Sequence, residues 1–121
     1  MRRRALHEQP RRDTQRMKGV LDHCLLALIA RWPMYGFEII TSLDELGLMV
    51  VAEGTIYPVL KRMGEAGLVE VEDTRSPDTG RMRRYYRITD AGRRQLEQWN
   101  EEWVSFADRV GKILQVELSA D

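Results

Sequence analysis

The chain contains 121 residues, of which 43% are hydrophobic and 31% are charged, and these fractions are typical of one globular domain with a tail or an additional helix. Its longest mainly apolar stretch, residues 20–29, is too short for a membrane-spanning helix, and its basic N-terminus lacks the apolar segment of a secretory signal. A single cysteine cannot form an internal disulfide bond, so we expect a cytoplasmic protein with no membrane partner.

The formal net charge of zero conceals an uneven distribution of charge. The first 18 residues contain seven basic and two acidic side chains, and residues 75–87 contain five arginines and one aspartate. From residue 90 onward, four basic side chains stand against seven acidic ones. Because binding to phosphates requires a locally positive surface and not a positive average, the neutral total does not exclude a nucleic-acid-binding protein.

The N-terminal part of the chain predicts a basic arm and a first helix. Residues 1–17 are polar and rich in arginine, without an apolar period, and they predict a flexible basic arm. Residues 18–31 place apolar side chains on most sides of a helix that Pro33 would end. We therefore expect this helix to be buried against a partner subunit as well as against its own core. The residues expected in this dimer contact are Val20, Leu21, Leu25 and Leu28.

Two further helices are predicted after the first. Residues 36–46 predict a helix with Gly47 as its terminator, and residues 53–66 predict another that Gly67 closes. The last of these has an apolar stripe and an opposite polar face, which is typical of a recognition helix that enters the major groove of DNA. For an isolated amphipathic helix, a merely solvated face is the alternative. The residues expected to contact DNA from this helix are Thr55, Tyr57, Pro58, Lys61 and Arg62.

The apolar period then changes from that of a helix to that of a strand. Residues 68–74 and 82–89 predict two strands joined by the turn-rich segment 76–80, with Tyr86 and Ile88 on one face of the second strand. Three helices followed by a hairpin with a basic tip predict a winged helix. Arginines at such a tip suit contacts with phosphates or a narrow minor groove, although they would also keep an edge strand soluble. The expected wing contacts are Arg81, Arg83 and Arg84.

Residues from 90 to about 118 predict a long last helix that Thr89 or Asp90 caps. Its apolar side chains recur at alternating steps of three and four residues, and its length of about 40 Å is more than a small domain can cover. We therefore expect a homodimer contact along this seam, and packing on the chain's own domain is the alternative. The residues of the seam are Leu96, Trp99, Trp103, Phe106, Val110 and Ile113.

Trp99 and Trp103 also suggest a pocket for a small, flat aromatic effector, and the alternative is that both indoles fill a dry interface. Sites for metals, cofactors or catalysis are not expected. The two histidines of the chain are His7 and His23, and adjacent side chains such as His23 and Cys24 point about 100° apart on a helix. We interpret Cys24 as a buried, inert thiol.

Three motifs stand out in the sequence: GTIYPVLKRM from residue 54, followed by EAGLV from residue 65; GRMRRYYRITDAG from residue 80; and YGFEII from residue 35. The first resembles the recognition helix of the PadR-type transcriptional regulators. The second resembles the wing of that family and its junction with the last helix, and the third resembles its second helix. The resemblance covers roughly residues 18–110, and it places Tyr35 among the expected DNA-binding residues.

This resemblance implies a dimeric winged helix-turn-helix repressor of the smaller subtype, with a single C-terminal helix. Such a protein would bind a two-fold symmetric operator and often respond to a small effector. One departure is Ala52, which stands where the family often has a serine as the N-cap of the recognition helix.

The sequence thus predicts a mainly α fold with a small β-hairpin. A winged helix-turn-helix over residues 18–89 follows the arm of residues 1–17, and a C-terminal dimerisation helix spans residues 90–121. We expect a repressor that binds double-stranded DNA as a homodimer, with release by a small aromatic effector. The alternative is a winged-helix module that binds an acidic protein partner, and an enzyme is not expected.

Overall fold

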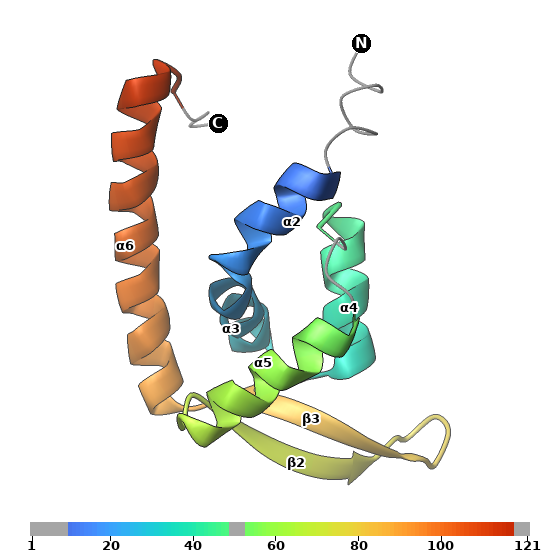
Figure 1. Ribbon diagram of the computed structural model, residues 1–121. Coiled ribbons are helices and arrows are strands. Elements are labelled where there is room, and N and C mark those ends of the chain that lie inside the picture. The colour runs from blue at the N-terminus through green and yellow to red at the C-terminus, as the bar shows by residue number, and fades with distance from the viewer. Residues whose placement is uncertain (1–9, 49–52, 118–121) are drawn as a thin grey trace.

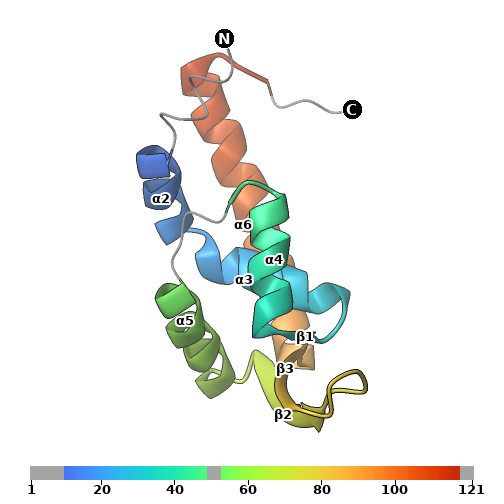
Figure 2. The same ribbon diagram turned by 90° about the vertical axis from the view of Figure 1, so that its right-hand side faces the viewer.

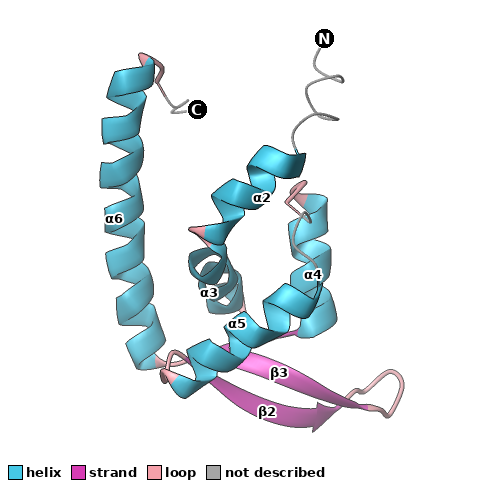
Figure 3. Cartoon of the chain, in the orientation of Figure 1, coloured by secondary structure: helices cyan, strands magenta, loops and turns pink. Residues whose placement is uncertain are grey.

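The computed structural model describes residues 10–48 and 53–117, and Figure 1 shows how their helices and strands are arranged. In chain order the elements are α2 (Pro10–Lys18), α3 (Leu21–Arg31), β1 (Met34–Tyr35), α4 (Gly36–Glu45), α5 (Glu53–Glu65), β2 (Val69–Arg75), β3 (Met82–Ile88) and α6 (Asp90–Leu114). The described residues are mainly helical, with a small three-stranded sheet at one end of the molecule (Figure 3). The predicted class, a mainly α winged-helix fold with a long C-terminal helix, is confirmed.

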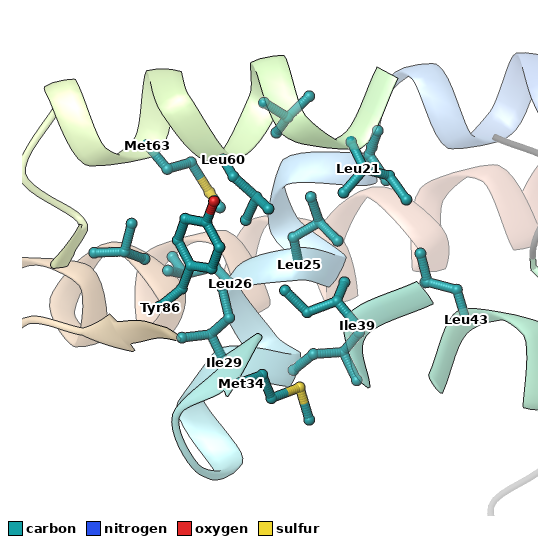
Figure 4. Close-up of a cluster of buried hydrophobic side chains, with 14 of the residues drawn as sticks. Leu21, Leu25, Leu26, Ile29, Met34, Ile39, Leu43, Leu60, Met63 and Tyr86 are labelled. Carbon is teal, nitrogen blue, oxygen red and sulfur yellow. The ribbon is translucent and has the colours of Figure 1, made fainter. Parts of the chain in front are cut away.

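The hydrophobic core forms around α3. Leu25, Leu26 and Ile29 of this helix are fully enclosed, and they cluster with side chains from α4, α5 and the sheet (Figure 4). Burial of one such side chain stabilises the fold by about 1.5–3 kcal/mol relative to its exposure. The buried residues that the other helices and the strands contribute are Met17, Met34, Ile39, Leu43, Ile56, Val59, Leu60, Met63, Val69, Tyr86 and Ile88.

The sheet is antiparallel and has the strand order β1-β3-β2. Strands β2 and β3 form the predicted hairpin, in which Val69 lies opposite Ile88. Tyr86 and Ile88 face the core, as the alternation of side chains along this strand predicted. Strand β1 was not predicted, because two residues are too few to show an alternating pattern. It places Tyr35 opposite Tyr85 of β3, and we call the part of the β2–β3 hairpin that pairs with β1 the root of the wing.

Helix α6 starts beside the sheet and extends past α3 towards the opposite end of the molecule (Figures 1 and 2). The Thr89 hydroxyl oxygen accepts a hydrogen bond from the N–H of Gly92 at 2.9 Å, which confirms one of the two predicted caps. The helix ends at Leu114, before the predicted end near residue 118, and Gln115 takes up the left-handed conformation typical of a helix C-terminus (φ 59°). Within the described ranges, no helix is long and apolar enough to cross a membrane.

Helix α2 corrects the prediction of a flexible arm over residues 1–17. It extends from Pro10, the first described residue, to Lys18. Met17 is buried against the core, and Arg16 pairs with Asp13 at 3.2 Å. One buried methionine anchors the helix without giving the segment an apolar period, so the sequence pattern did not reveal it. Residues 1–9 of the predicted arm lie outside the described residues.

The burial of α3 also corrects part of the predicted dimer contact. Leu21, Leu25 and Leu28 are buried inside a single protomer, so they belong to its own core and not to an interface. Val20 is partly exposed and lies beside α6. A helix that is apolar on most sides is buried in either case, so the pattern alone does not distinguish the centre of a small domain from a partner contact.

We predict that Gly92→Ala destabilises the junction between the wing and α6. A methyl group at this position would collide with the backbone carbonyl of Leu68 and would lie 2.7 Å from Cγ1 of Ile88. Because backbone atoms cannot move aside cheaply, we expect the free energy of unfolding to fall by about 1–3 kcal/mol, measured by urea denaturation. Gly64→Ala is the matched control, since a methyl group there meets no atom within 4 Å. Equal stability of the two variants would contradict the predicted collision.

Candidate nucleic-acid interface

Helix α5 carries the predicted recognition face at the surface of the molecule. Its Ile56 and Leu60 are fully buried, so the opposite side of the helix faces solvent. Pro58 lies inside the helix and removes only the hydrogen bond that an N–H there would make to Gly54. The position of Ala52, and with it the missing N-cap, lies outside the described residues. The predicted contact residues that are exposed on α5 are Thr55, Tyr57, Pro58, Lys61 and Arg62.

The tip of the wing is a closed turn stabilised by its own hydrogen bonds. Ser76 is buried, and its Oγ accepts hydrogen bonds from the N–H groups of Asp78 (3.2 Å) and Thr79 (3.4 Å). The N–H of Ser76 donates to the carbonyl of Arg81 at 2.7 Å, and Gly80 provides the left-handed φ of 74°. The exposed side chain of Arg81 therefore projects from a well-defined backbone.

Two arginines of the wing form ion pairs with acids of β2. Arg84 pairs with Asp73 at 3.0 Å, and Arg87 pairs with Glu72 at 3.2 Å. The hydrogen bond from Arg84 lowers the pKa of the Asp73 carboxyl and so favours its charged form. Arg81 forms no ion pair among the residues that the structure describes. The charge of Arg84 is therefore partly neutralised, whereas that of Arg81 remains available for an external partner.

Tyr35 connects the root of the wing to the start of α4. Its ring lies edge-on to the ring of Tyr85, with 5.4 Å between centroids, and the guanidinium of Arg83 lies 4.3 Å from the centre of the Tyr35 ring. The N–H of Tyr35 donates to Oε1 of Glu38 at 3.1 Å. The sequence predicted Tyr35 and Arg83 as two separate DNA contacts, and the structure brings them into contact with each other.

A groove of about 990 Å³ lies between α5 and the hairpin. Tyr57 and Lys61 line it from the helix, and Arg84 lines it from β3. Glu70 and Glu72 of β2 also line the groove, so its charge is mixed. The predicted contacts on the helix and part of those on the wing thus share one continuous surface, on the side where α5 lies along the sheet (Figure 1).

A second cavity, of about 630 Å³, lies between α6 and the segment that joins α2 to α3. The ring of His23 lies 5.8 Å from that of Trp99, and its Nε2 is 2.7 Å from Oδ1 of Asn100. The two tryptophans predicted to bind an effector therefore share a cavity within one protomer. The place of His23 in it was not predicted, because the α3 pattern identifies only apolar positions. The residues that line this cavity are Arg16, Gly19, Val20, Asp22, His23, Trp99, Glu102, Trp103 and Phe106.

Two observations on the described residues bear on metal binding and on the reactivity of Cys24. In these parts of the chain, no group of three or more His, Cys, Asp or Glu side chains is arranged to hold a metal ion. Cys24 is half-buried, and this burial, together with the charge of Asp22, raises the pKa of its thiol. A raised pKa disfavours the reactive thiolate, so the predicted inert role of Cys24 agrees with its surroundings.

Comparison with known proteins relates the chain to transcriptional regulators. The sequence profile of the transcriptional regulator PadR-like family matches residues 25–98. A PadR-like transcriptional regulator from Bacillus cereus, whose crystal structure is known, shares 41% sequence identity with this chain. The two structures match with a TM-score of 0.77, over 85% of this chain and 99% of the Bacillus cereus chain. A PadR family transcriptional regulator from Eggerthella lenta is 31% identical, with a TM-score of 0.74, over 86% of this chain and 89% of that one. An uncharacterized protein from Lysinibacillus sphaericus is 28% identical over 101 residues, which are 82% of this chain and 92% of that protein.

Proposed function

The chain belongs to the PadR-like family and is a DNA-binding transcriptional regulator rather than an enzyme, and from this premise we propose that it is a repressor that binds a palindromic operator as a homodimer. The observation that carries the proposal is the surface shared by α5 and the hairpin, where an exposed polar helix lies beside a wing with an exposed arginine at its tip. A helix of this kind fits the major groove, while the arginine reaches neighbouring phosphates.

The two parts of this surface would have different roles. Thr55, Tyr57 and Lys61 are exposed on the helix, where side chains can reach the edges of bases, so α5 would discriminate sequence. Arg81 lies at the wing tip, where it would contact phosphates and contribute affinity for any DNA. Glu72 and Asp73 of β2 would weaken the non-specific attraction of the wing to phosphates. The same negative charges would disfavour the alternative function, which is binding of an acidic protein partner.

The homodimer is proposed from the exposed apolar side of α6. Trp103 is 46% exposed, Phe106 51% and Ile113 81%, and all three lie on the three-four repeat of this helix. Large apolar side chains in a row are costly to leave in water, and a second copy of the same helix would cover them. Such a dimer presents two recognition helices, which must lie about 34 Å apart to engage both halves of an operator.

Control by an effector is proposed from the cavity beside α6. Trp99 and Trp103 offer aromatic surfaces to a flat apolar molecule, and the cavity volume of about 630 Å³ suits a small ligand. Because the cavity lies where the proposed dimer contact begins, its occupation would change the spacing of the two recognition helices. A ligand shifts this spacing only as far as it prefers one arrangement over the other.

We predict that Tyr57→Ala and Arg81→Ala weaken DNA binding in different ways. For Tyr57→Ala we compare the affinity for random DNA with the affinity for a duplex that the protein selects from a randomised pool. The substitution should reduce the ratio of these two affinities. Arg81→Ala should weaken both by a similar factor and flatten the slope of log K against log salt by about one unit. Fluorescence anisotropy at several salt concentrations measures both effects. Indifference of the unmutated protein to duplex DNA would contradict the proposed operator binding and would support the alternative, a module that binds an acidic protein.

We predict that Trp103→Ala weakens the homodimer. Removing the indole leaves a cavity that costs on the order of 3 kcal/mol, so the dissociation constant of the dimer should rise about a hundredfold, measured by sedimentation equilibrium. Val104→Ala is the control, because Val104 is exposed on α6 but does not belong to the three-four repeat. A folded monomer of the unmutated protein at micromolar concentration would refute the proposed dimer.

We predict that planar aromatic compounds quench tryptophan fluorescence and release the selected duplex over the same range of concentrations. Measuring this in a Trp32→Phe background removes the third indole, which is exposed away from the cavity. Quenching without release would indicate a cavity that binds ligands but does not control DNA binding. No quenching across a broad panel of compounds would indicate that the indoles serve only in packing.

A further inference from the structure

The ring of Tyr57 in α5 lies directly against Gly36, the first residue of α4. A Cβ atom built on Gly36 would lie 2.5 Å from Oη of Tyr57, 2.9 Å from Cε1 and 3.0 Å from Cζ. Such distances are shorter than van der Waals contact, so any other residue at this position would have to displace the ring. The absence of a side chain at Gly36 therefore creates the space that the phenol occupies.

The backbone of α4 gives no reason for a glycine at this position. Gly47, Gly67 and Gly80 have φ values of 73°, 79° and 74°, which other residues adopt only with strain, whereas Gly36 has no such positive φ. It lies in the first turn of a regular helix, where alanine is more favourable than glycine. The contact with Tyr57, and not the conformation of the chain, is what requires glycine here.

A methyl group at Gly36 would displace a side chain and leave the backbone in place. The three atoms that it would approach all belong to the outer end of the Tyr57 ring, and this side chain is 44% exposed. The ring can therefore turn into solvent without disturbing the core, because Ile56 and Leu60 hold α5 from its other side. Gly92 differs in this respect, since a methyl group there meets the backbone of Leu68.

Gly36 also follows the residue that supports the wing. Tyr35 contacts Arg83 and Tyr85 of β3, so two consecutive residues contact the wing on one side and the recognition helix on the other. The aromatic side chain on α5 and the root of the wing are thus positioned from the same short segment.

We propose that Gly36 is a positioning residue for sequence recognition: by leaving room for the Tyr57 ring, it holds the phenol of the recognition helix in the orientation that meets a base edge. This proposal rests on the proposed function, because it assumes that α5 reads DNA. Gly36 itself makes no contact with DNA in this arrangement.

The test compares Gly36→Ala with Gly64→Ala, a glycine in α5 where a methyl group meets no atom within 4 Å. We expect Gly36→Ala to reduce the preference for the selected duplex over random DNA about tenfold, as when one base contact is lost. Its melting temperature should remain within about 2 °C of the unmutated protein. Nuclear Overhauser contacts between the Tyr57 ring and the α-protons of residue 36 should be lost. Gly64→Ala should leave the DNA preference and the contacts of the Tyr57 ring unchanged, and it should not lower the melting temperature.

A second pair of variants separates positioning from a structural role. In a Tyr57→Ala background the space is free, so adding Gly36→Ala should not change the DNA preference further and should not lower the stability. An additional loss of stability in this double variant would show that the methyl group meets something other than the ring, and would overturn the proposal. Unchanged DNA preference in Gly36→Ala alone would also overturn it. If the unmutated protein prefers no duplex, the proposed function itself fails, and this inference fails with it.

Discussion

Helix α3 presents apolar side chains on most of its circumference, so it is stable only when other elements cover it. Leu25, Leu26 and Ile29 are fully enclosed, and α4, α5 and the sheet each supply part of the enclosure. Each covering element is consequently apolar on one side and polar on the other. The outward orientation of the candidate DNA-binding face follows from this requirement, because α5 can bury Ile56 and Leu60 only with its polar residues in solvent.

The wing depends on the same core through β3. The buried side chains of Tyr86 and Ile88 hold this strand against the core. The hydroxyl of Thr89 donates a hydrogen bond to the carbonyl of Gly67 at 2.6 Å, and its oxygen accepts the N–H of Gly92 that caps α6. The end of α5, the root of the wing and the start of α6 therefore meet at one junction. Helix α6, which borders the second cavity, is thus joined directly to the wing at this junction.

The sequence predicted the elements whose periodicity extends over several turns or strand residues, which are α3, α4, α5, the hairpin and α6. It missed β1, because two residues show no period, and α2, because a single buried methionine stabilises it. The exposed residues of α5 were correctly placed, since one apolar stripe determines the opposite face. Partners across the sheet could not be predicted: the pairing of Arg84 with Asp73 and the contact of Arg83 with Tyr35 depend on register and on β1. The contact between Gly36 and Tyr57 joins two helices whose packing no local pattern encodes.

A chain with no net charge can still present a locally basic surface to DNA. The segment from residue 90 onward is acidic, and α6 carries most of it away from the sheet towards the other end of the molecule (Figure 1). The basic helix α2 also lies away from the sheet, so in the proposed complex the charge that would turn the hairpin towards a duplex is that of the exposed Arg81 at the wing tip. Because the acids of β2 neutralise two wing arginines, the attraction to any one stretch of DNA stays weak. In the proposed complex, more of the binding free energy would then come from α5, and this contribution would differ between an operator and the large excess of other sequences.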